Sequence, residues 1–347
     1  MKSGMAILSK APSRITFGGG GSDIHPIPEL HGGLCLNATI NKYVTTQFRW
    51  RDDDTVIFNN IRANEELHTN LSSLKKVSDT NTKFSIPLTI ASFFGNKIRN
   101  GFDLHIMSDT NLRSGLGTSA TLFVSIIGAF NEALGIGMTR HQIAETAFSL
   151  ENKKMGKHGG RQDQYAAVFG GFNLFEFKKN NNVVVKPVKL SRNTILELRE
   201  KLLLFFITPR FTSPDKIIKS TMKNFSSSHA SDTSVGAVLR VKKIASASKK
   251  ALLANDMENL GRLLDLNWKE KKLFSALVSN SSVEGFYEEL KRAGAIGGKL
   301  LGAGGGGHML FVCPLFKKIE IINKATELGA EHIDYDFVPH GLVTWRG

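Results

Sequence analysis

The sequence contains little cysteine and no long apolar run. Its 347 residues include only Cys35 and Cys313, which form no CxxC pair, so neither a disulfide framework nor a zinc site is indicated. The most apolar stretches, such as 122–130 and 202–207, are far shorter than the roughly 20 residues of a membrane span. No apolar segment follows the first basic residue, so no signal peptide is predicted. These absences favour a cytoplasmic protein with no membrane partner.

Two familiar phosphate-binding signatures are missing or misplaced. The P-loop pattern GxxxxGK[ST] does not occur, which disfavours a P-loop nucleotidase. Residues 115–120 match GxGxxA and residues 302–307 match GxGxxG, but neither lies in a clear opening βαβ unit. A Rossmann oxidoreductase is therefore disfavoured as well.

The formal net charge of +14 comes from scattered lysines and arginines rather than from one basic block. Neither a zinc finger nor an aromatic RNA-binding strand accompanies them. We therefore expect no nucleic-acid partner and attribute the charge to a solvated surface that also attracts nucleotide phosphates. A nucleotide- or nucleic-acid-binding protein remains the alternative, and salt-sensitive binding to random oligonucleotides would support it.

Strand and helix patterns alternate along the chain, and 41% of the residues are apolar, which is enough for a sizeable core. We predict a two-domain α+β fold, with an N-terminal domain at 1–195 and a C-terminal domain at 196–347. Residues 52–82 are polar and are expected to form an irregular surface excursion. The predicted strands are 6–17, 38–50, 102–107, 172–177, 183–190, 202–208, 308–313, 333–337 and 342–345. The predicted helices are 86–99, 118–134, 140–153, most of 213–277, and 316–328.

The central glycine motif is RSGLGTSA at 113–120, where a predicted loop, 108–117, opens into a predicted helix. Its glycines let the backbone approach a ligand closely. Thr118 and Ser119 then open an apolar helix, whose N-terminal N–H groups and positive dipole end favour a bound phosphate. The Ser119 hydroxyl could also ligate a magnesium ion. A simple glycine turn with a hydroxyl cap explains the pattern equally well.

Two further glycine clusters stand near the ends of the chain. KAPSR at 10–14 precedes FGGGGSD at 17–23, where Arg14 could neutralise phosphate charge and Asp23 could accept hydrogen bonds from sugar hydroxyls. A glycine turn with Asp23 as its cap is the alternative. KLLGAGGGGH at 299–308 is too glycine-rich for a core strand and suits close packing against a nucleotide.

Two acidic residues are candidates for catalysis. Asp163, in GGRQDQY at 159–165, is the best candidate for a base or an orienting carboxylate near an acceptor hydroxyl. Glu151 ends an amphipathic helix and could ligate magnesium. The alternatives are a helix N-terminal charge for Asp163 and a solvated helix residue for Glu151.

Taken in order, KAPSRITFGGGGSD, SGLGTSATL and KLLGAGGGGHMLF resemble the three signature regions of the GHMP kinases. HGGLCLNATINKYV at 31–44 and GGRQDQYAAVFGGFNLFEF at 159–177 are similar to the heptose kinase branch of that family. The resemblance implies a two-domain α+β fold with ATP bound between the domains. It also makes Glu151 a magnesium ligand rather than a solvated residue.

The motifs and the resemblance together predict a set of site residues. Asp163 and Arg14 are the predicted catalytic residues, and Ser119 and Glu151 are the predicted Mg²⁺ ligands. The residues expected around ATP are Ser114, Gly115, Leu116, Gly117, Thr118, Ser119, Gly304 and Gly305. The residues expected around the sugar are Gly20, Ser22, Asp23 and Arg161. The candidates for a phosphate subsite on the sugar are Lys153, Lys157 and Arg161.

The expected reaction is ATP-dependent phosphorylation of the anomeric hydroxyl of a sugar phosphate. The resemblance implies D-glycero-D-manno-heptose 7-phosphate as acceptor, giving the 1,7-bisphosphate. One alternative is a kinase of an unphosphorylated hexose, heptose or fucose-like sugar. Another is a non-catalytic sugar- or nucleotide-binding regulator, which the joint presence of Asp163, Glu151 and Ser119 disfavours. The sequence does not indicate an oligomeric state.

Overall fold

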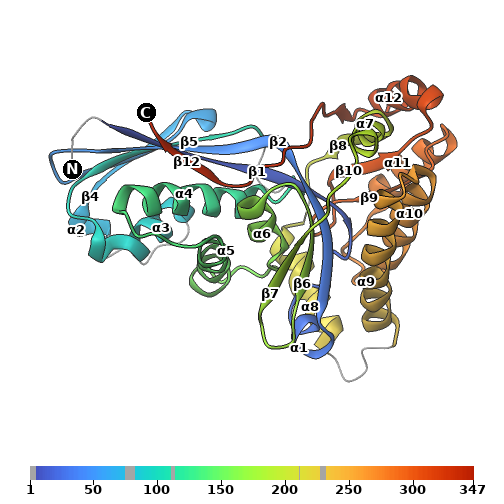
Figure 1. Ribbon diagram of the computed structural model, residues 1–347, viewed down its shortest axis with the longest axis horizontal. Helices are drawn as coiled ribbons and strands as arrows, with labels where there is room; N and C mark the ends of the chain where they lie inside the picture. The colour runs from blue at the N-terminus through green and yellow to red at the C-terminus, as the bar shows by residue number, and fades with distance from the viewer. Residues whose placement is uncertain (1–4, 75–82, 111–113, 211, 227–231) are drawn as a thin grey trace.

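The fold is built on two β-sheets with helices packed against each (Figure 1). It is seen in a computed structural model that describes residues 5–74, 83–110, 114–210, 212–226 and 232–347. Residues 111–113, which belong to the predicted loop 108–117 and include the first residue of the central glycine motif, lie outside the described residues. Within the described ranges, no helix has the length and apolar character needed to cross a membrane.

The larger sheet has eight strands and is antiparallel except for the parallel pair β3 and β5. Its order is β12-β1-β2-β5-β3-β4, with β6 beside β2 and β7 beside β6. The strands are β1 (Ala6–Gly18), β2 (Gly33–Trp50), β3 (Thr55–Asn60), β4 (Glu65–Asn70), β5 (Phe102–Ser108), β6 (Phe172–Phe177), β7 (Val183–Pro187) and β12 (Val343–Arg346). The C-terminal strand β12 thus pairs with the N-terminal strand β1.

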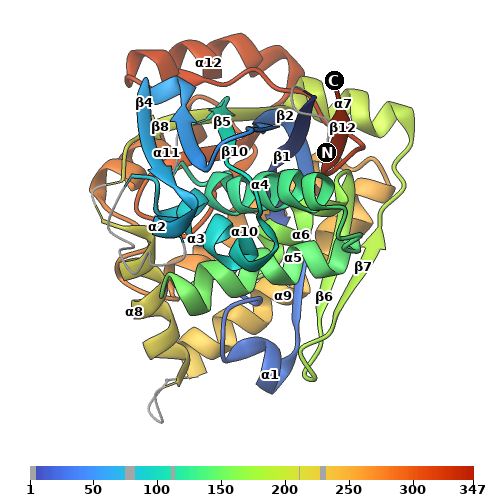
Figure 2. The ribbon, with the colours of Figure 1, turned by 90° about the vertical axis from the view of Figure 1, so that its left-hand side faces the viewer.

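Helices α3 (Ser85–Phe94), α4 (Thr118–Leu134) and α5 (Arg140–Ser149) lie side by side on one face of this sheet (Figures 1 and 2). The middle helix, α4, is apolar on nearly every side because it packs between the sheet and its neighbours. The short helix α6 (Gln162–Phe169) packs beside α4 and against β1. These contacts bring the starts of α4 and α6 to β1.

The smaller sheet has the order β11-β8-β10-β9 and carries the remaining long helices. Its strands are β8 (Leu202–Thr208), β9 (Gly297–Leu300), β10 (Gly307–Val312) and β11 (Glu331–His332). The helices of this half are α7 (Arg192–Lys201), α8 (Pro214–Ser226), α9 (Asp232–Leu253), α10 (Met257–Lys272), α11 (Ser281–Arg292) and α12 (Lys318–Glu327). Both α9 and α10 also contact β1, and one apolar cluster that includes Phe17, Leu116 and Leu260 joins the two halves.

Several predicted elements are confirmed with their bounds, namely the helix 118–134 and the strands 172–177 and 202–208. The prediction for 140–153 is partly wrong, because the α-helix ends at Ser149 and continues as a π-turn, Leu150–Lys154. The predicted strand 333–337 is also wrong: Phe337 makes only an isolated bridge to Ile40.

The expectation of an irregular segment at 52–82 is wrong for its described part. Strands β3 and β4 pair there as a hairpin. The polar residues that suggested a loop lie on the exposed positions, while Val56 and Phe58 alternate into the core beside β5. This hairpin extends the larger sheet beyond β5.

Candidate active site

The Arg14 side chain links the start of α6 to the central glycine loop. Arg14 lies on β1 and is almost fully buried. Its Nε and Nη2 atoms lie 2.8 Å and 2.7 Å from Oδ1 of Asp163, in the first turn of α6. Its Nη1 donates to the Gly115 carbonyl at 2.7 Å. Because one guanidinium contacts both, the carboxylate and the loop are held in a fixed relation.

The glycine loop 114–117 leads into α4 without a side-chain cap. Gly115 and Gly117 have φ of +99° and +79°, which favours glycine at both positions. The cap residue Gly117 offers no side-chain acceptor, so the first N–H groups of this 17-residue helix are available to an anion. The Ser114 hydroxyl is buried without a hydrogen-bond partner. The Thr118 hydroxyl forms a hydrogen bond with the Thr110 hydroxyl at 2.8 Å.

Ser119 and Glu151 meet at the same end of α4. The Ser119 hydroxyl donates to Oε1 of Glu151 at 2.7 Å, and Gln164 donates to Oε2 at 2.9 Å. Glu151 lies in the π-turn, an irregularity that is frequent at functional sites. Burial raises the pKa of Glu151 above its ordinary value, and Lys157 opposes this rise. A cation beside this carboxylate would favour its charged form.

These oxygen atoms fit magnesium, which takes few protein ligands and completes its shell with water and substrate phosphates. Among the described residues, no group of three or more His, Cys, Asp or Glu side chains could hold a metal. A metal at Ser119 and Glu151 would therefore depend on the nucleotide for most of its ligands.

The third glycine motif, 299–308, packs directly on the central one, 113–120. A Cβ atom on Gly302 would lie 2.7 Å from the Gly115 Cα atom. Arg210, which follows β8, donates through Nε to the carbonyls of Gly304 and Gly306 at 2.8 Å and 3.1 Å. Burial, and then the charge of Arg14, lowers the pKa of Arg210 to about 10. No local pattern in the sequence marks Arg210, so its place in the site was not predicted.

Lys271, on α10, also holds the third glycine motif. Its ammonium donates to the carbonyls of Leu300 and Gly302, and burial lowers its pKa well below the ordinary value. The attribution of the scattered basic residues to a solvated surface is wrong for Lys271, which is only 6% exposed. Two buried cations, Lys271 and Arg210, thus fix the carbonyl oxygens of this loop.

On the predicted sugar side, two of the polar side chains are engaged within the protein. The Ser22 hydroxyl exchanges hydrogen bonds with the backbone of Leu34. Asp23 is buried and accepts from the N–H of Gly21 and from Gln162. Burial, and then the nearby charge of Asp163, raises the pKa of Asp23. Gly20 is partly exposed between this turn and Gln162.

The structure does not bring Arg161 to the Arg14–Asp163 pair. Its guanidinium stacks over the Phe148 ring at 4.5 Å and lies 3.4 Å from both Glu145 and Asn181. Lys153, a second candidate for a phosphate subsite, is exposed beyond α5.

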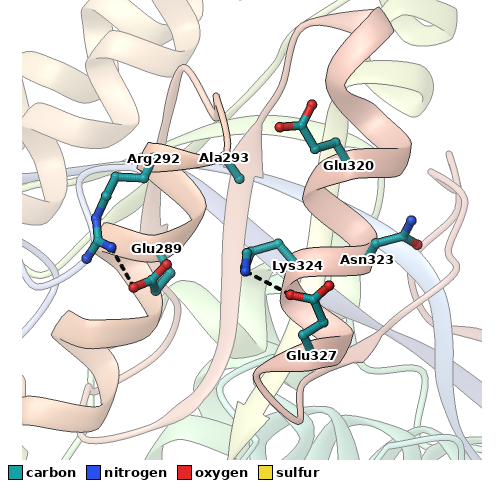
Figure 3. Close-up of a pocket in the computed structure, with 7 residues that line it drawn as sticks. All are labelled: Glu289, Arg292, Ala293, Glu320, Asn323, Lys324 and Glu327. Carbon is teal, nitrogen blue, oxygen red and sulfur yellow. Dashed lines mark hydrogen bonds and ion pairs between the residues drawn. The ribbon is translucent and has the colours of Figure 1, made fainter.

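A surface pocket lies between α11 and α12, apart from every predicted site residue (Figure 3). Within it, Arg292 pairs with Glu289 and Lys324 pairs with Glu327. Both of its cations are paired with carboxylates, so neither is free to bind a phosphate.

Lys299, on β9, is a further buried amine, and its Nζ donates to the Thr16 carbonyl at 3.1 Å. Burial lowers the pKa of Lys299 to about 7. In the unfolded chain its pKa is about 10, so unfolding takes up a proton between these values and stability rises with pH.

We therefore predict a pH-dependent difference between the wild type and Lys299→Met. Between about pH 7.5 and about pH 9.5, the free energy of unfolding of the wild type should rise, relative to that of the variant, by up to about 1.4 kcal/mol per pH unit. Urea unfolding at several pH values measures this, with the exposed Lys97→Met as control. Parallel curves for the wild type and Lys299→Met would contradict the assignment.

Comparison with known proteins identifies the family. Residues 85–171 match the GHMP kinases N terminal domain, and residues 248–331 match the GHMP kinases C terminal domain. The chain is 33% identical to D-glycero-alpha-D-manno-heptose 7-phosphate kinase of Campylobacter jejuni, over 98% of this chain and 99% of that relative. The chain belongs to the GHMP kinases, which are ATP-dependent phosphotransferases.

Solved structures show the same fold. A D-glycero-D-manno-heptose 1-phosphate kinase from Bacteroides thetaiotaomicron superimposes with a TM-score of 0.81 at 28% identity, covering 98% of both chains. Lactococcus lactis galactokinase, solved with galactose, gives 0.76 at 18% identity over 97% of this chain and 95% of its own, a likeness of fold alone. The predicted two-domain α+β GHMP kinase fold is therefore confirmed.

Proposed function

We propose that this kinase transfers the γ-phosphoryl group of ATP to the anomeric hydroxyl of D-glycero-D-manno-heptose 7-phosphate. The main support for this proposal is the position of Arg14, which contacts both Asp163 and the Gly115 carbonyl. These contacts hold a carboxylate beside the loop that we propose for phosphate binding. The heptose acceptor is supported by the 33% identity to a heptose 7-phosphate kinase across nearly the whole chain.

The site residues have distinct roles in the proposed reaction. N–H groups of 115–119 at the start of α4 hold the triphosphate, and the third glycine motif, held by Arg210 and Lys271, closes over it. Asp163 accepts a hydrogen bond from the acceptor hydroxyl and orients it or takes its proton. Arg14 offsets the negative charge between the carboxylate and the phosphoryl group.

Ser119 and Glu151 would hold Mg²⁺, which neutralises phosphate charge when bound. Gly304 and Gly305 would lie against the nucleotide, and Gly20 against the sugar. Asp23 and Ser22 were predicted to contact the sugar, but Gln162 and Leu34 already bind their polar atoms, so the backbone of this turn is the surface that we propose for the acceptor.

A kinase of an unphosphorylated sugar is the second candidate, and one observation favours it. Of the cations expected at a 7-phosphate subsite, Arg161 is engaged on α5 and Lys153 is exposed beyond it. A phosphate dianion is seldom bound without charged partners. Lys157, which acts on the charge of Glu151, is the remaining candidate of that set.

The acceptor is tested by measuring magnesium-dependent ATP consumption with a panel of heptose 7-phosphate, heptose 1-phosphate, free heptose, mannose, galactose, fucose, mevalonate and homoserine. We expect turnover with heptose 7-phosphate to exceed that with free heptose by at least about tenfold in kcat/KM. Turnover with free sugars alone would replace the proposed acceptor by the second candidate. ATP binding without any turnover would favour a regulator.

A further inference from the structure

The side chain of Gln162 is fixed by hydrogen bonds at both ends of its amide. Its Nε2 donates to Oδ1 of Asp23 at 3.0 Å, and its Oε1 accepts from the Thr16 hydroxyl at 3.1 Å. Its backbone N–H donates to Oδ2 of Asp23 at 3.1 Å. Both polar atoms of the amide and the first N–H of α6 are thus committed to partners on β1 and on the glycine turn.

These partners are placed by the period of the strand. Residues 14 and 16 of β1 are two positions apart, so their side chains point to the same face of the sheet. On that face Arg14 contacts Asp163, and Thr16 contacts the residue before it, Gln162. Two consecutive residues of α6 are therefore matched to two consecutive same-face positions of β1.

The backbone that leads to Gln162 passes close to the Asp23 side chain. A Cβ atom on Gly160 would collide with the Asp23 carboxylate, so the chain passes directly over this side chain before α6 begins. Asp23 is only 4% exposed, and its two oxygens accept from the Gly21 N–H and from Gln162. Its carboxylate works as the N-terminal cap of α6, supplied from a distant turn.

We propose that Gln162 is a positioning residue, held by Thr16 and Asp23, that sets the start of α6 so that the Asp163 carboxylate meets Arg14 and the acceptor hydroxyl. This inference rests on the proposed role of Asp163. Asp23 then acts on the geometry of the reaction through Gln162. Gln162 thereby controls the position of the attacking hydroxyl. A displacement of about 1 Å at a reacting centre costs about 10²-fold in rate.

Gln162→Ala should lower kcat by about 10²-fold, while KM for the acceptor and the Kd for ATP change less than about threefold. Gln162→Glu sets a second carboxylate against Asp23, and two close carboxylates favour sharing a proton. The kcat of Gln162→Glu relative to wild type should therefore rise at least about fivefold as the pH falls from about 8 to about 6. Gln47→Glu, on β2, adds the same charge and should follow the wild type at every pH.

The double variant Asp23→Asn/Gln162→Glu removes one of the two facing carboxylates and restores an amide donor at this contact, while the Gly21 N–H, which shares Oδ1 of Asp23 with Gln162 Nε2, loses its acceptor. At about pH 8, we expect the kcat of the double variant to be at least about tenfold higher than that of Gln162→Glu. Thermal unfolding and ATP binding identify any variant that fails to fold, and Gln162→Glu is then compared with its own double variant.

Two results would overturn the inference. One is a Gln162→Ala variant that keeps kcat and raises KM for the acceptor, which would make Gln162 a substrate contact. The other is a Gln162→Glu defect that is relieved neither by low pH nor by the added Asp23→Asn substitution. All rates are measured with the acceptor that the wild type uses best, so a different acceptor would change the proposed function and leave this test intact.

Discussion

Asp163→Asn is expected to lower kcat by about 10³-fold without loss of ATP binding. General acid–base groups contribute about 10²- to 10⁴-fold, and an asparagine can orient a hydroxyl but accepts no proton. The amide oxygen of this variant can still accept from Arg14, so the link to the glycine loop is retained. Steady-state kinetics and nucleotide titration of the same preparation measure the two effects separately.

The control for charge is Asp54→Asn, which removes a carboxylate from an exposed turn before β3 and should leave kcat unchanged. Near-normal turnover by folded Asp163→Asn would remove the carboxylate from the chemistry. A loss of about tenfold or less would indicate a carboxylate that orients the hydroxyl without taking its proton.

Gly302→Ala is expected to weaken ATP binding by at least about 100-fold, because two glycine loops touch at this position. The added methyl group would meet the Gly115 Cα atom at 2.7 Å and the Arg210 guanidinium at 2.8 Å. Neither neighbour can retreat easily, since Arg210 is tied to the loop carbonyls and Gly115 to Arg14. The N–H groups that would face phosphate should be displaced, and a loss of about 2.7 kcal/mol of binding corresponds to about 100-fold.

Gly137→Ala separates backbone strain from this collision. Gly137 has φ of +74°, close to the +68° of Gly302, but a methyl group there meets nothing within 4 Å. Both variants carry the left-handed penalty of about 1–2 kcal/mol in stability. Equal ATP affinity in the two variants would show that the contact between the glycine loops has no part in nucleotide binding.

Local patterns predicted much of this architecture. The helix 118–134 and the strand 202–208 could be read with their bounds because each is a continuous apolar run with clear ends. The hairpin at 55–70 could not, since Ile57 interrupts the apolar–polar alternation of β3 and β4 is a mostly polar edge strand. The π-turn that places Glu151 has no sequence signature of its own.

The residues of the glycine motifs were predictable, but their partners were not. Glycine clusters mark close backbone approach, so 114–119 and 302–307 could be recognised locally. Arg210 and Lys271 stand outside every motif, and only the fold reveals that they hold the third one. Arg161 and Gln162 are neighbours in one motif, yet the helical turn sends the first toward α5 and the second toward β1.

The pairing of β12 with β1 has a consequence for biosynthesis. Residues 7–10 of β1 pair on one side with β2 and on the other with residues 343–346. On the ribosome, the strand that carries Arg14 is therefore made early but keeps an open edge until every element of the second half has emerged. Open strand edges invite pairing with other chains. A nascent chain that stalls before residue 343 would present this edge to its neighbours on a polysome, so the demand for chaperones should be greatest late in translation.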